Sequence, residues 1–367
     1  MLDFYRPEVT AVSAAIDHNV PLGPFTTLGV GGPADVFRTA ADTAGLIEVV
    51  READSAGTQL LILGGGSNLV VSDEGVRGTV VLVESDRTGI VADDGTTVRV
   101  RVDAGVEWDA FVRQQTGAGL SGLECLCGIP GKVGSTPIQN VGAYGQDVSQ
   151  SIVEVVVYDR ESGRMRAMDN DECGFTYRDS AFKGHSRYVV CEVVFELTRS
   201  DLSTPIRYAE LARFLGVETG ERVPLATVPP AVLQLRRSKG MVVDPADPDS
   251  HSAGSFFTNP ILSTEEFADF TKRAVTVLGP DVQPPVYPAG EGRVKLSAAW
   301  LIERAGFAKG HGTGPARIST KHTLALTNPG GATTADLLEL AREVRAGVGE
   351  AFGVTLVNEP VMVGVSL

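Results

Sequence analysis

The sequence predicts an α+β protein of two or three domains, with a strand-dominated, glycine-rich first half and a more helical second half. Three observations lead to this prediction. The chain has 367 residues, more than one ordinary hydrophobic core encloses. Short Val/Ile/Leu runs alternate with glycine clusters as far as residue 200. Beyond that point, apolar residues recur mostly at helical spacing.

In the first half, we expect a helix over residues 42–52, because Asp42 is a suitable N-cap and Leu46, Val49 and Val50 share one face. A second helix is expected over residues 108–117. Short runs of aliphatic and β-branched residues predict strands, which we place at 60–63, 79–83, 97–102 and 152–158.

In the second half, helical spacing predicts helices over residues 231–237, 296–305 and 334–352, the last ending near Gly353. We expect the chain to return as a strand over residues 354–367. Polar segments rich in proline, at 245–252 and 283–292, are expected to be loops.

Composition narrows the classes of function. The chain has 46 acidic and 32 basic residues and a formal charge of −14, so broad binding to nucleic acid or to anionic membrane surfaces is disfavoured. The sequence starts Met-Leu-Asp-Phe-Tyr-Arg, without a basic region before an apolar run, and no apolar stretch reaches the length of a membrane span. We therefore expect a cytoplasmic enzyme or binding protein.

Cysteine and histidine spacing gives no reason to expect a metal. Cys125 and Cys127 form C-x-C rather than C-x-x-C, and with Cys173 and Cys191 they are interpreted as buried free thiols. The five histidines are scattered along the chain. We expect neither a structural nor a catalytic metal site.

Two glycine-rich loops are the strongest local signals. The segment Gly64-Gly65-Gly66-Ser67-Asn68 directly follows a predicted strand, so its backbone N–H groups could approach an anion; taken alone, it could equally be a tight turn. It matches neither G-x-G-x-x-G nor a P-loop. The second loop, residues 128–145, is long and fixed by glycine and proline. Two such loops indicate a long ligand bound through backbone groups, such as a dinucleotide.

With these loops in place, the chain closely resembles the bacterial UDP-N-acetylenolpyruvoylglucosamine reductases. The resemblance spans nearly the whole sequence, and the order and spacing of its segments make it specific. The matching segments are TTLGVGGPADVF (26–37), LILGGGSNLVVSDEGVRG (61–78), GIPGKVGSTPIQNVGAYG (128–145), FTYRDSAFK (175–183), AGSFFTNP (253–260), KLSAAWLIERAGFAKG (295–310) and LVNEPVMVG (356–364).

The resemblance implies a fold and a domain plan. It implies the FAD-binding fold of the vanillyl-alcohol oxidase (PCMH) type in two subdomains, at residues 1–85 and 86–200. A third α+β domain for the substrate would follow at 201–350, with a C-terminal strand, 351–367, that returns to the flavin. It also implies a monomer of the longer subclass, in which a mobile Tyr loop closes over the substrate. Neither glycine-rich loop contains His or Cys, so the FAD is expected to be non-covalent.

The same resemblance implies the reaction. The enolpyruvyl ether of UDP-N-acetylglucosamine enolpyruvate would be reduced to UDP-N-acetylmuramate for peptidoglycan synthesis, with NADPH as the electron donor. Two alternatives stay open at this point. One is another oxidase or dehydrogenase on the same FAD fold, and the other is a nucleotide-sugar sensor that does no chemistry.

The resemblance also assigns site residues. Ser255 would donate the proton, Arg178 would stabilise the enolate, and Glu359 would bind the enolate carboxyl or polarise the donor. From the sequence alone, Arg178 could instead form a surface ion pair with Asp179 or Glu192, and Ser255 could be an ordinary turn serine. The implied FAD contacts are Gly64, Gly65, Gly66, Ser67, Asn68, Ile129, Gly134, Ser135, Ile138, Asn140 and Gly142, and the implied substrate contacts are Tyr177, Tyr208, Arg236, Lys239, Asn259 and Arg304.

Overall fold

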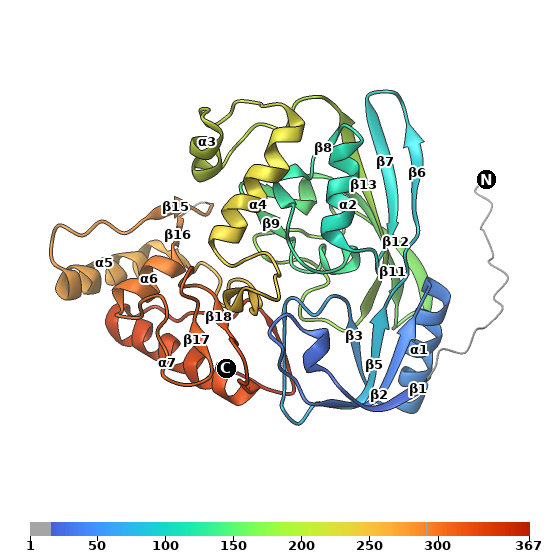
Figure 1. The fold of residues 1–367 in the computed structure, drawn as a ribbon, viewed down its shortest axis with the longest axis horizontal. Coiled ribbons are helices and arrows are strands. Elements are labelled where there is room, and N and C mark those ends of the chain that lie inside the picture. The colour runs from blue at the N-terminus through green and yellow to red at the C-terminus, as the bar shows by residue number, and fades with distance from the viewer. Residues whose placement is uncertain (1–15, 291) are drawn as a thin grey trace.

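Three sheets of three or more strands, three two-stranded pairs and the helices that cover them make up the described part of the protein. The computed structural model describes residues 16–290 and 292–367, so the first fifteen residues, where the predicted first subdomain begins, lie outside the described residues. Figure 1 shows the strands of the first two sheets on one side and the helices α5, α6 and α7 on the other. The predicted α+β class is confirmed.

The first sheet has the strand order β1-β2-β5-β3, in which β2, β5 and β3 run parallel. Val80 of β5 lies opposite both Phe37 and Leu61 and is completely buried. Helix α1 packs on this sheet, and the predicted N-cap is confirmed because the Asp42 carboxylate accepts a hydrogen bond from Gly45 N–H. The elements are β1 Ile16–Pro21, β2 Pro33–Ala40, α1 Thr43–Ala56, β3 Gln59–Leu63 and β5 Val76–Val83.

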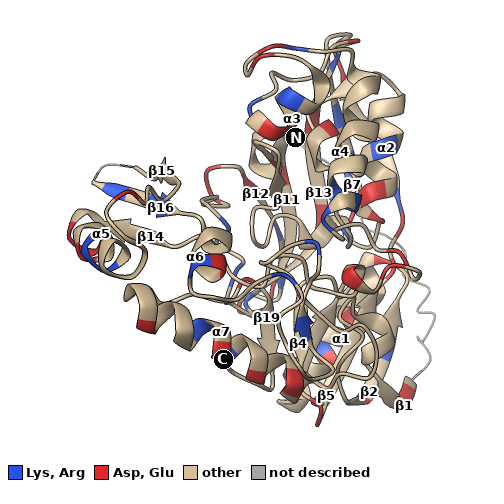
Figure 2. Cartoon of the chain, turned by 60° about the vertical axis from the view of Figure 1, so that its left-hand side comes forward, with Lys and Arg blue, Asp and Glu red and all other residues tan. Residues whose placement is uncertain are grey.

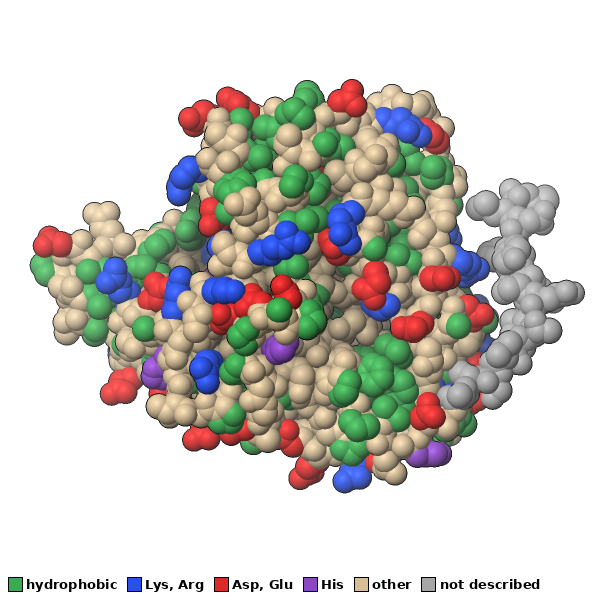
Figure 3. All heavy atoms as spheres, viewed as in Figure 1, with side chains coloured by type: hydrophobic (Ala, Val, Ile, Leu, Met, Phe, Trp, Pro, Cys, Tyr) green, Lys and Arg blue, Asp and Glu red, His purple; other side chains and the backbone are tan. Residues whose placement is uncertain are grey.

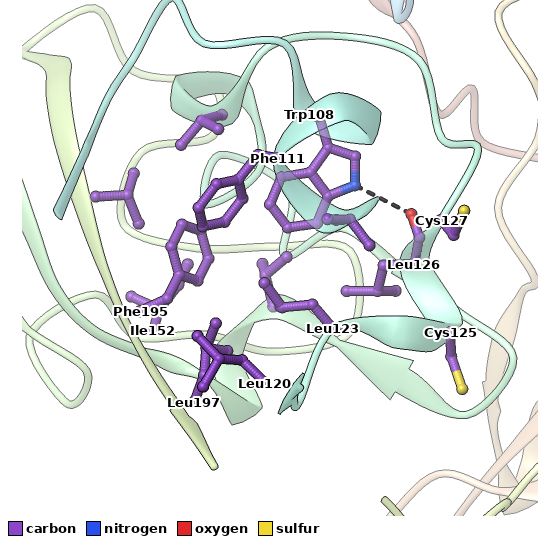
Figure 4. Packing of buried hydrophobic residues seen from close by; sticks show 14 of the residues in the cluster. Trp108, Phe111, Leu120, Leu123, Cys125, Leu126, Cys127, Ile152, Phe195 and Leu197 are labelled. Atoms are coloured by element: carbon purple, nitrogen blue, oxygen red, sulfur yellow. Dashed lines mark hydrogen bonds between the residues drawn. The ribbon is translucent and has the colours of Figure 1, made fainter. Parts of the chain in front are cut away.

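The second sheet is antiparallel, with the strand order β12-β11-β13-β7-β6 and the short β8 pairing with β13. Its core is aromatic: Trp108, Phe111 and Phe195 lie with ring centroids 5.3 to 6.1 Å apart, and the indole N–H of Trp108 donates to the Leu126 carbonyl (Figure 4). The strands are β6 Thr88–Asp93, β7 Thr97–Asp103, β8 Leu120–Ser121, β11 Ile152–Asp159, β12 Arg164–Asp169 and β13 Tyr188–Arg199.

Three helices cover the second sheet: α2 Trp108–Gly117, which matches its predicted bounds, α3 Ala209–Leu215 and α4 Val228–Ser238. Helix α4 begins three residues before the predicted start, because Pro229 and Pro230 fit its first turn. Leu211 and Val232 are buried in the same cluster as Trp108. The segment after residue 200, expected in the third domain, therefore packs on the second sheet.

The third sheet, β14-β16-β15, is small and carries most of the remaining helices. Phe270, Trp300 and Phe352, from α5, α6 and α7, pack together with ring centroids 5.9 to 6.4 Å apart. The elements are β14 Ile261–Ser263, α5 Thr264–Leu278, β15 Val286–Pro288, β16 Arg293–Leu296, α6 Ala298–Arg304, β17 Arg317–Ile318, β18 Leu326–Thr327 and α7 Thr334–Phe352.

Three predictions for the second half were partly wrong. The helix expected from residue 296 starts at Ala298, because Leu296 ends β16 and Ser297 is the N-cap. The expected loop 283–292 contains β15. The C-terminal strand is confined to β19, Val361–Val363, which pairs in parallel with β4, Leu69–Val71. Proline at 360 has no N–H to donate to a ladder, so regular pairing begins only after it.

Short elements complete the chain. The strands β9 Gly142–Ala143 and β10 Gln146–Asp147 form a small hairpin. The 3₁₀ helices are η1 Gly23–Phe25, η2 Glu124–Leu126, η3 Val133–Ser135, η4 Val148–Gln150, η5 Leu225–Thr227 and η6 Pro248–Ser250.

Side-chain hydrogen bonds join the β4 segment to the start of α7. The Asp73 carboxylate accepts from the N–H groups of Thr334 and Ala335, at the start of α7, at 2.8 and 2.9 Å. The Thr334 hydroxyl donates to the Val71 carbonyl at 2.6 Å. Together with the β4–β19 pairing, these bonds hold the C-terminal part of the chain against the β4 segment.

Both signs of charge are dispersed over the elements (Figure 2), and hydrophobic side chains gather in one patch on the face seen in Figure 3, at the level of the first sheet. Within residues 16–290 and 292–367, no helix combines the length and the apolar character that crossing a membrane requires.

Candidate active site

The two glycine-rich loops predicted from the sequence lie against each other. A Cβ added to Gly65 would lie 2.6 Å from the Gly131 Cα, which is closer than real side chains approach. The Ser67 hydroxyl donates to the Pro130 carbonyl at 3.0 Å, and the Asn68 amide donates to Gln139 Oε1 at 2.8 Å. The two loops therefore form one continuous wall in which backbone atoms lie close together.

This wall has the properties of a dinucleotide cradle. Gly66 has a φ of +59°, and a Cβ there would lie 1.8 Å from the Phe25 carbonyl oxygen, so only glycine fits. The N–H groups of residues 65–68 donate to no acceptor in the described part of the chain. Unpaired N–H groups in a turn suit a diphosphate. A cavity of about 490 Å³ opens on Gly64, Gly65 and Lys132.

The second loop is fixed by hydrogen bonds that leave its backbone in place for a ligand. Asn140 has a φ of +45°; its side chain donates to the Thr176 carbonyl at 3.1 Å and accepts from Ser149 N–H at 3.1 Å. The Ile138 carbonyl accepts from the Ser180 hydroxyl at 2.6 Å. The other predicted cofactor residues of this loop lie along the same stretch and are Ile129, Gly134, Ser135 and Gly142.

Arg178 lies in a tight turn pinned to this loop. Thr176 and Asp179 form a backbone bridge, and Arg178 has a φ of +56° at the third turn position, which usually favours glycine. Its Nη2 donates to the Gly142 carbonyl at 2.8 Å. Holding arginine in this conformation costs on the order of 1 kcal/mol, and such strain concentrates at functional sites.

Glu359 faces Arg178. Oε1 lies 2.9 Å from Arg178 Nε, and the Glu359 side chain is only 12% exposed. Burial raises the pKa of Glu359, and the positive charges of Arg178 and Lys183 oppose that rise. The surface pair of Arg178 with Asp179 or Glu192 is therefore not formed, and Glu192 pairs with Arg101 instead.

Ser255 lies on a segment that pairs with the Glu359 segment. The Glu359 N–H donates to the Phe256 carbonyl at 2.9 Å, and Phe257 forms a bridge with Asn358. Ser255 is half-buried, and its hydroxyl has no hydrogen-bond partner among the described residues. In turn, Val361 N–H donates to the Asn68 carbonyl at 2.9 Å. Backbone pairing thus brings the segments of Ser255 and Glu359 to the first glycine loop.

A second cluster gathers tyrosines and a lysine. Tyr208, the N-cap residue of α3, packs edge-on against Tyr144 with ring centroids 5.5 Å apart. Lys239 Nζ pairs with the Glu210 carboxylate and lies 5.8 Å from the Tyr144 ring centroid. Burial, together with nearby Lys239, lowers the pKa of His322 to about 4. The cluster offers a cation and hydroxyl groups at one place.

The remaining predicted substrate residues are not drawn into one group. Arg236 is buried and donates to the backbone carbonyls of Gly128 and Met241, and burial lowers its pKa. Asn259 Oδ1 accepts from Ala298 N–H at the start of α6. Arg304 is exposed and lies 5.9 Å from the Trp300 ring centroid.

Three residues of the site were missed by the sequence reasoning: Lys295, Lys183 and Gln139. The Tyr177 ring, which was predicted, lies 5.5 Å from the Arg178 guanidinium and 4.6 Å from Lys295 Nζ, which was not. Lys183 Nζ donates to the Arg178 carbonyl at 2.6 Å, and Gln139 accepts from Asn68. Both lysines belong to quoted motifs, FTYRDSAFK and KLSAAWLIERAGFAKG, which was the available signal.

The four cysteines are free and buried, as interpreted from the sequence. Burial raises the pKa of each thiol to about 12. Among the residues of the two described ranges, no group of three or more His, Cys, Asp or Glu side chains is arranged to hold a metal ion.

The fold and the two apposed glycine loops define an FAD-binding protein of the α+β class. The family profile described as "FAD binding domain" matches residues 34–168, which contain every predicted cofactor residue. The profile described as "UDP-N-acetylenolpyruvoylglucosamine reductase, C-terminal domain" matches residues 245–363, which contain Ser255 and Glu359.

Whole-chain comparisons identify the family. UDP-N-acetylenolpyruvoylglucosamine reductase from Thermobifida fusca is 68% identical over 97% of this chain and 100% of its own length, and that from Streptomyces coelicolor is 60% identical over 95% and 91%. The crystal structure of the reductase from Thermus caldophilus is 26% identical, with a TM-score of 0.64 over 95% of this chain and 99% of the other. The chain belongs to the UDP-N-acetylenolpyruvoylglucosamine reductase family.

Proposed function

We propose that this protein reduces the enolpyruvyl ether of UDP-N-acetylglucosamine enolpyruvate to UDP-N-acetylmuramate, with non-covalently bound FAD and NADPH as the electron donor. The observation that carries the proposal is the Arg178–Glu359 pair, which lies against both glycine loops and the Ser255 segment. A sugar nucleotide and NADPH are cytoplasmic metabolites, so we place the reaction in the cytoplasm. We expect the enzyme to be a monomer.

The glycine cradle suits FAD. Its unpaired N–H groups at residues 65–68 would hold the diphosphate, and the stretch from Ile129 to Gly142 would follow the rest of the cofactor. FAD held in this cradle would supply the hydride chemistry, taking up a hydride from NADPH and passing one to the terminal vinyl carbon of the substrate.

Arg178 and the side chains around it then stabilise the developing negative charge and supply one proton. Negative charge develops on the second vinyl carbon and spreads into the attached carboxylate, where the Arg178 guanidinium stabilises it with fixed, directed donors. Ser255 donates a proton to that carbon and regains one from solvent. Glu359, buried and held by Arg178, binds the carboxyl end or polarises the donor.

The tyrosine–lysine cluster would bind the diphosphate of the sugar nucleotide. Lys239 supplies a point charge and Tyr208 a hydroxyl, and Tyr208 is 44% exposed, so it can close over a ligand. Tyr177 would line the pyruvyl end. Arg236, Asn259 and Arg304 would contribute less directly, since their present contacts hold loop and helix backbone or lie on the surface.

We retain the division into FAD-binding subdomains at 1–85 and 86–200, a substrate-binding domain at 201–350 and a returning strand at 351–367. One feature refines it. Residues 201–240 would act as a cover over the second sheet that carries Tyr208 and Lys239 to the substrate, because their buried side chains join the core of that sheet.

Two anaerobic half-reactions in a stopped-flow spectrometer test the proposal. The purified protein is expected to be yellow, to release FAD on denaturation, to bleach with NADPH and to regain its colour on mixing with the enolpyruvyl sugar nucleotide. Bleaching without recolouring would indicate another oxidoreductase on the same fold. A protein without flavin would indicate a sugar-nucleotide sensor.

A further inference from the structure

The turn that carries Arg178 is contacted by a lysine outside the proposed reaction. Arg178 has a φ of +56°. The turn around it is closed by a single backbone bridge, between Thr176 and Asp179. In this bridge, Thr176 N–H donates to the Asp179 carbonyl at 3.0 Å, and the return bond from Asp179 N–H to the Thr176 carbonyl is longer, at 3.4 Å. Neither bond is made by Arg178, whose own carbonyl is left for another contact.

Lys183 supplies that contact. Its Nζ donates to the Arg178 carbonyl at 2.6 Å, a charge-assisted bond made to the strained residue itself. Lys183 is half-buried, and the Phe182 side chain beside it is buried in the core of the second sheet. Its ammonium group therefore reaches back to the turn from an anchored position.

Lys183 also acts on the partner of Arg178. Its charge, with that of Arg178, opposes the effect of burial on Glu359. The other segments that pack on Glu359 bring hydrogen bonds but no charge, through Asn68 and the Phe256 backbone. The Lys183 ammonium group thus bonds the backbone of Arg178 and also favours the charged form of the Glu359 carboxylate.

Resting on the proposed function, we infer that Lys183 is a positioning residue, which holds Arg178 in its left-handed turn and aims the guanidinium at the carboxyl end of the substrate. The ammonium donor and the Arg178 carbonyl acceptor are the contact that does this. Lys183 touches neither reacting carbon in this scheme, so its loss should affect one half-reaction and spare the other.

Three variants separate the hydrogen bond from the charge. Lys183→Met removes both, Lys183→Gln keeps a donor without charge, and Lys183→Arg keeps both. In Lys183→Met, flavin reoxidation by substrate should slow by about tenfold to a hundredfold, as expected when a catalytic group is misplaced. NADPH bleaching and FAD content should stay unchanged. Lys183→Arg should restore most of the rate, with Lys183→Gln between the two.

Two further readouts distinguish positioning from general damage. The dissociation constant of UDP-N-acetylmuramate, measured by calorimetry, should rise in Lys183→Met. The acidic limb of the reoxidation rate should move to higher pH, because a cation that lowers the pKa of Glu359 is gone. General damage to the fold alone would not raise the dissociation constant and move the acidic limb together. It would also not be reversed by Lys183→Arg.

The inference is overturned if Lys183→Met reoxidises at the parent rate, or if both half-reactions fall equally and Lys183→Arg rescues neither. If Lys183→Met does not fold, the comparison of Lys183→Gln with Lys183→Arg decides in the same way. A parent protein that bleaches but does not recolour would overturn the proposed function, and this inference with it.

Discussion

Arg178 Nε lies 2.9 Å from Glu359 Oε1, although the two residues belong to segments that are remote in the chain. Arg178 comes from a turn after β12, and Glu359 lies two residues before the start of β19. Arg178 Nε is buried and makes no hydrogen bond of good geometry with any described residue. Its contact with Glu359 is therefore an ion pair, and the Nε–H group can still donate a hydrogen bond to another acceptor. A substrate carboxylate entering here would meet a guanidinium that is already positioned.

Replacing Ser255 by alanine should separate the two half-reactions. Ser255→Ala is expected to bleach with NADPH at the parent rate but to regain colour about 100-fold to 10,000-fold more slowly, the range that a positioned proton donor contributes. Ser238→Ala is the matched control, since that exposed hydroxyl only donates to the Leu235 carbonyl at the end of α4. Equal losses in both half-reactions would exclude the donor role.

Glu359 should make the free energy of unfolding depend on pH. Its folded pKa is raised above its ordinary value of 4.5, so the folded state binds the proton more tightly than the unfolded state. The stability contributed by protonation of Glu359 is thus fully present below pH 4.5 and is lost as the pH rises through the pKa of Glu359 in the folded state. Glu359→Gln cannot titrate, so its stability relative to the parent should increase from pH 4.5 towards neutrality. Urea unfolding across that range measures the difference; a difference that shrinks with pH would contradict it.

Gly65→Ala should weaken FAD binding. The added methyl group would lie 2.6 Å from the Gly131 Cα and push the two loops apart. The expected result is a purified protein with a much lower ratio of flavin to protein absorbance. Gly117→Ala, at the end of α2 with nothing within 4 Å of the new Cβ, should keep its full flavin content. Full flavin retention in Gly65→Ala would show that the apposed loops do not bind the cofactor.

Lys239→Met should raise the Michaelis constant for the sugar nucleotide by about tenfold to a hundredfold, which corresponds to losing one hydrogen bond to a charged group. The rate at saturating substrate should change little. Lys272→Met, at a lysine that is 77% exposed and paired only with Asp269, provides the control. A large fall in the saturated rate with an unchanged Michaelis constant would place Lys239 at the reacting carbons instead.

The cysteines should resist thiol reagents in the native protein. All four are buried, and burial raises the pKa of each to about 12, so little thiolate exists at pH 8. Titration with a chromogenic disulfide should give little colour until a denaturant is added, and four equivalents thereafter. Rapid labelling of one native cysteine would show that its segment opens readily.

The sequence predicted helix ends well where the signal depends only on residues close together in the chain. Asp42 and Gly353 bound α1 and α7 close to the expected positions, because an N-cap and a left-handed C-cap are properties of the neighbouring residues. Leu296 was misplaced because apolar spacing alone does not distinguish the end of a strand from the start of a helix.

Contacts between residues far apart in the chain could not be predicted from the sequence. Nothing near Val361 indicates that its strand pairs in parallel with β4, since that register depends on residues from the other end of the chain. The positive φ of Arg178 was equally hidden, because arginine carries no preference for it and Lys183 holds it through space. The candidate residues came from the family resemblance, and their geometry came from the fold.

The pairing of β19 with β4 has a consequence for biosynthesis. The strand beside Glu359 closes onto a segment made early in translation, so β4 waits without this partner strand until residues 361–363 have emerged from the ribosomal exit tunnel. Until then the Glu359 carboxylate is not held beside Arg178, and the candidate site lacks one of its walls.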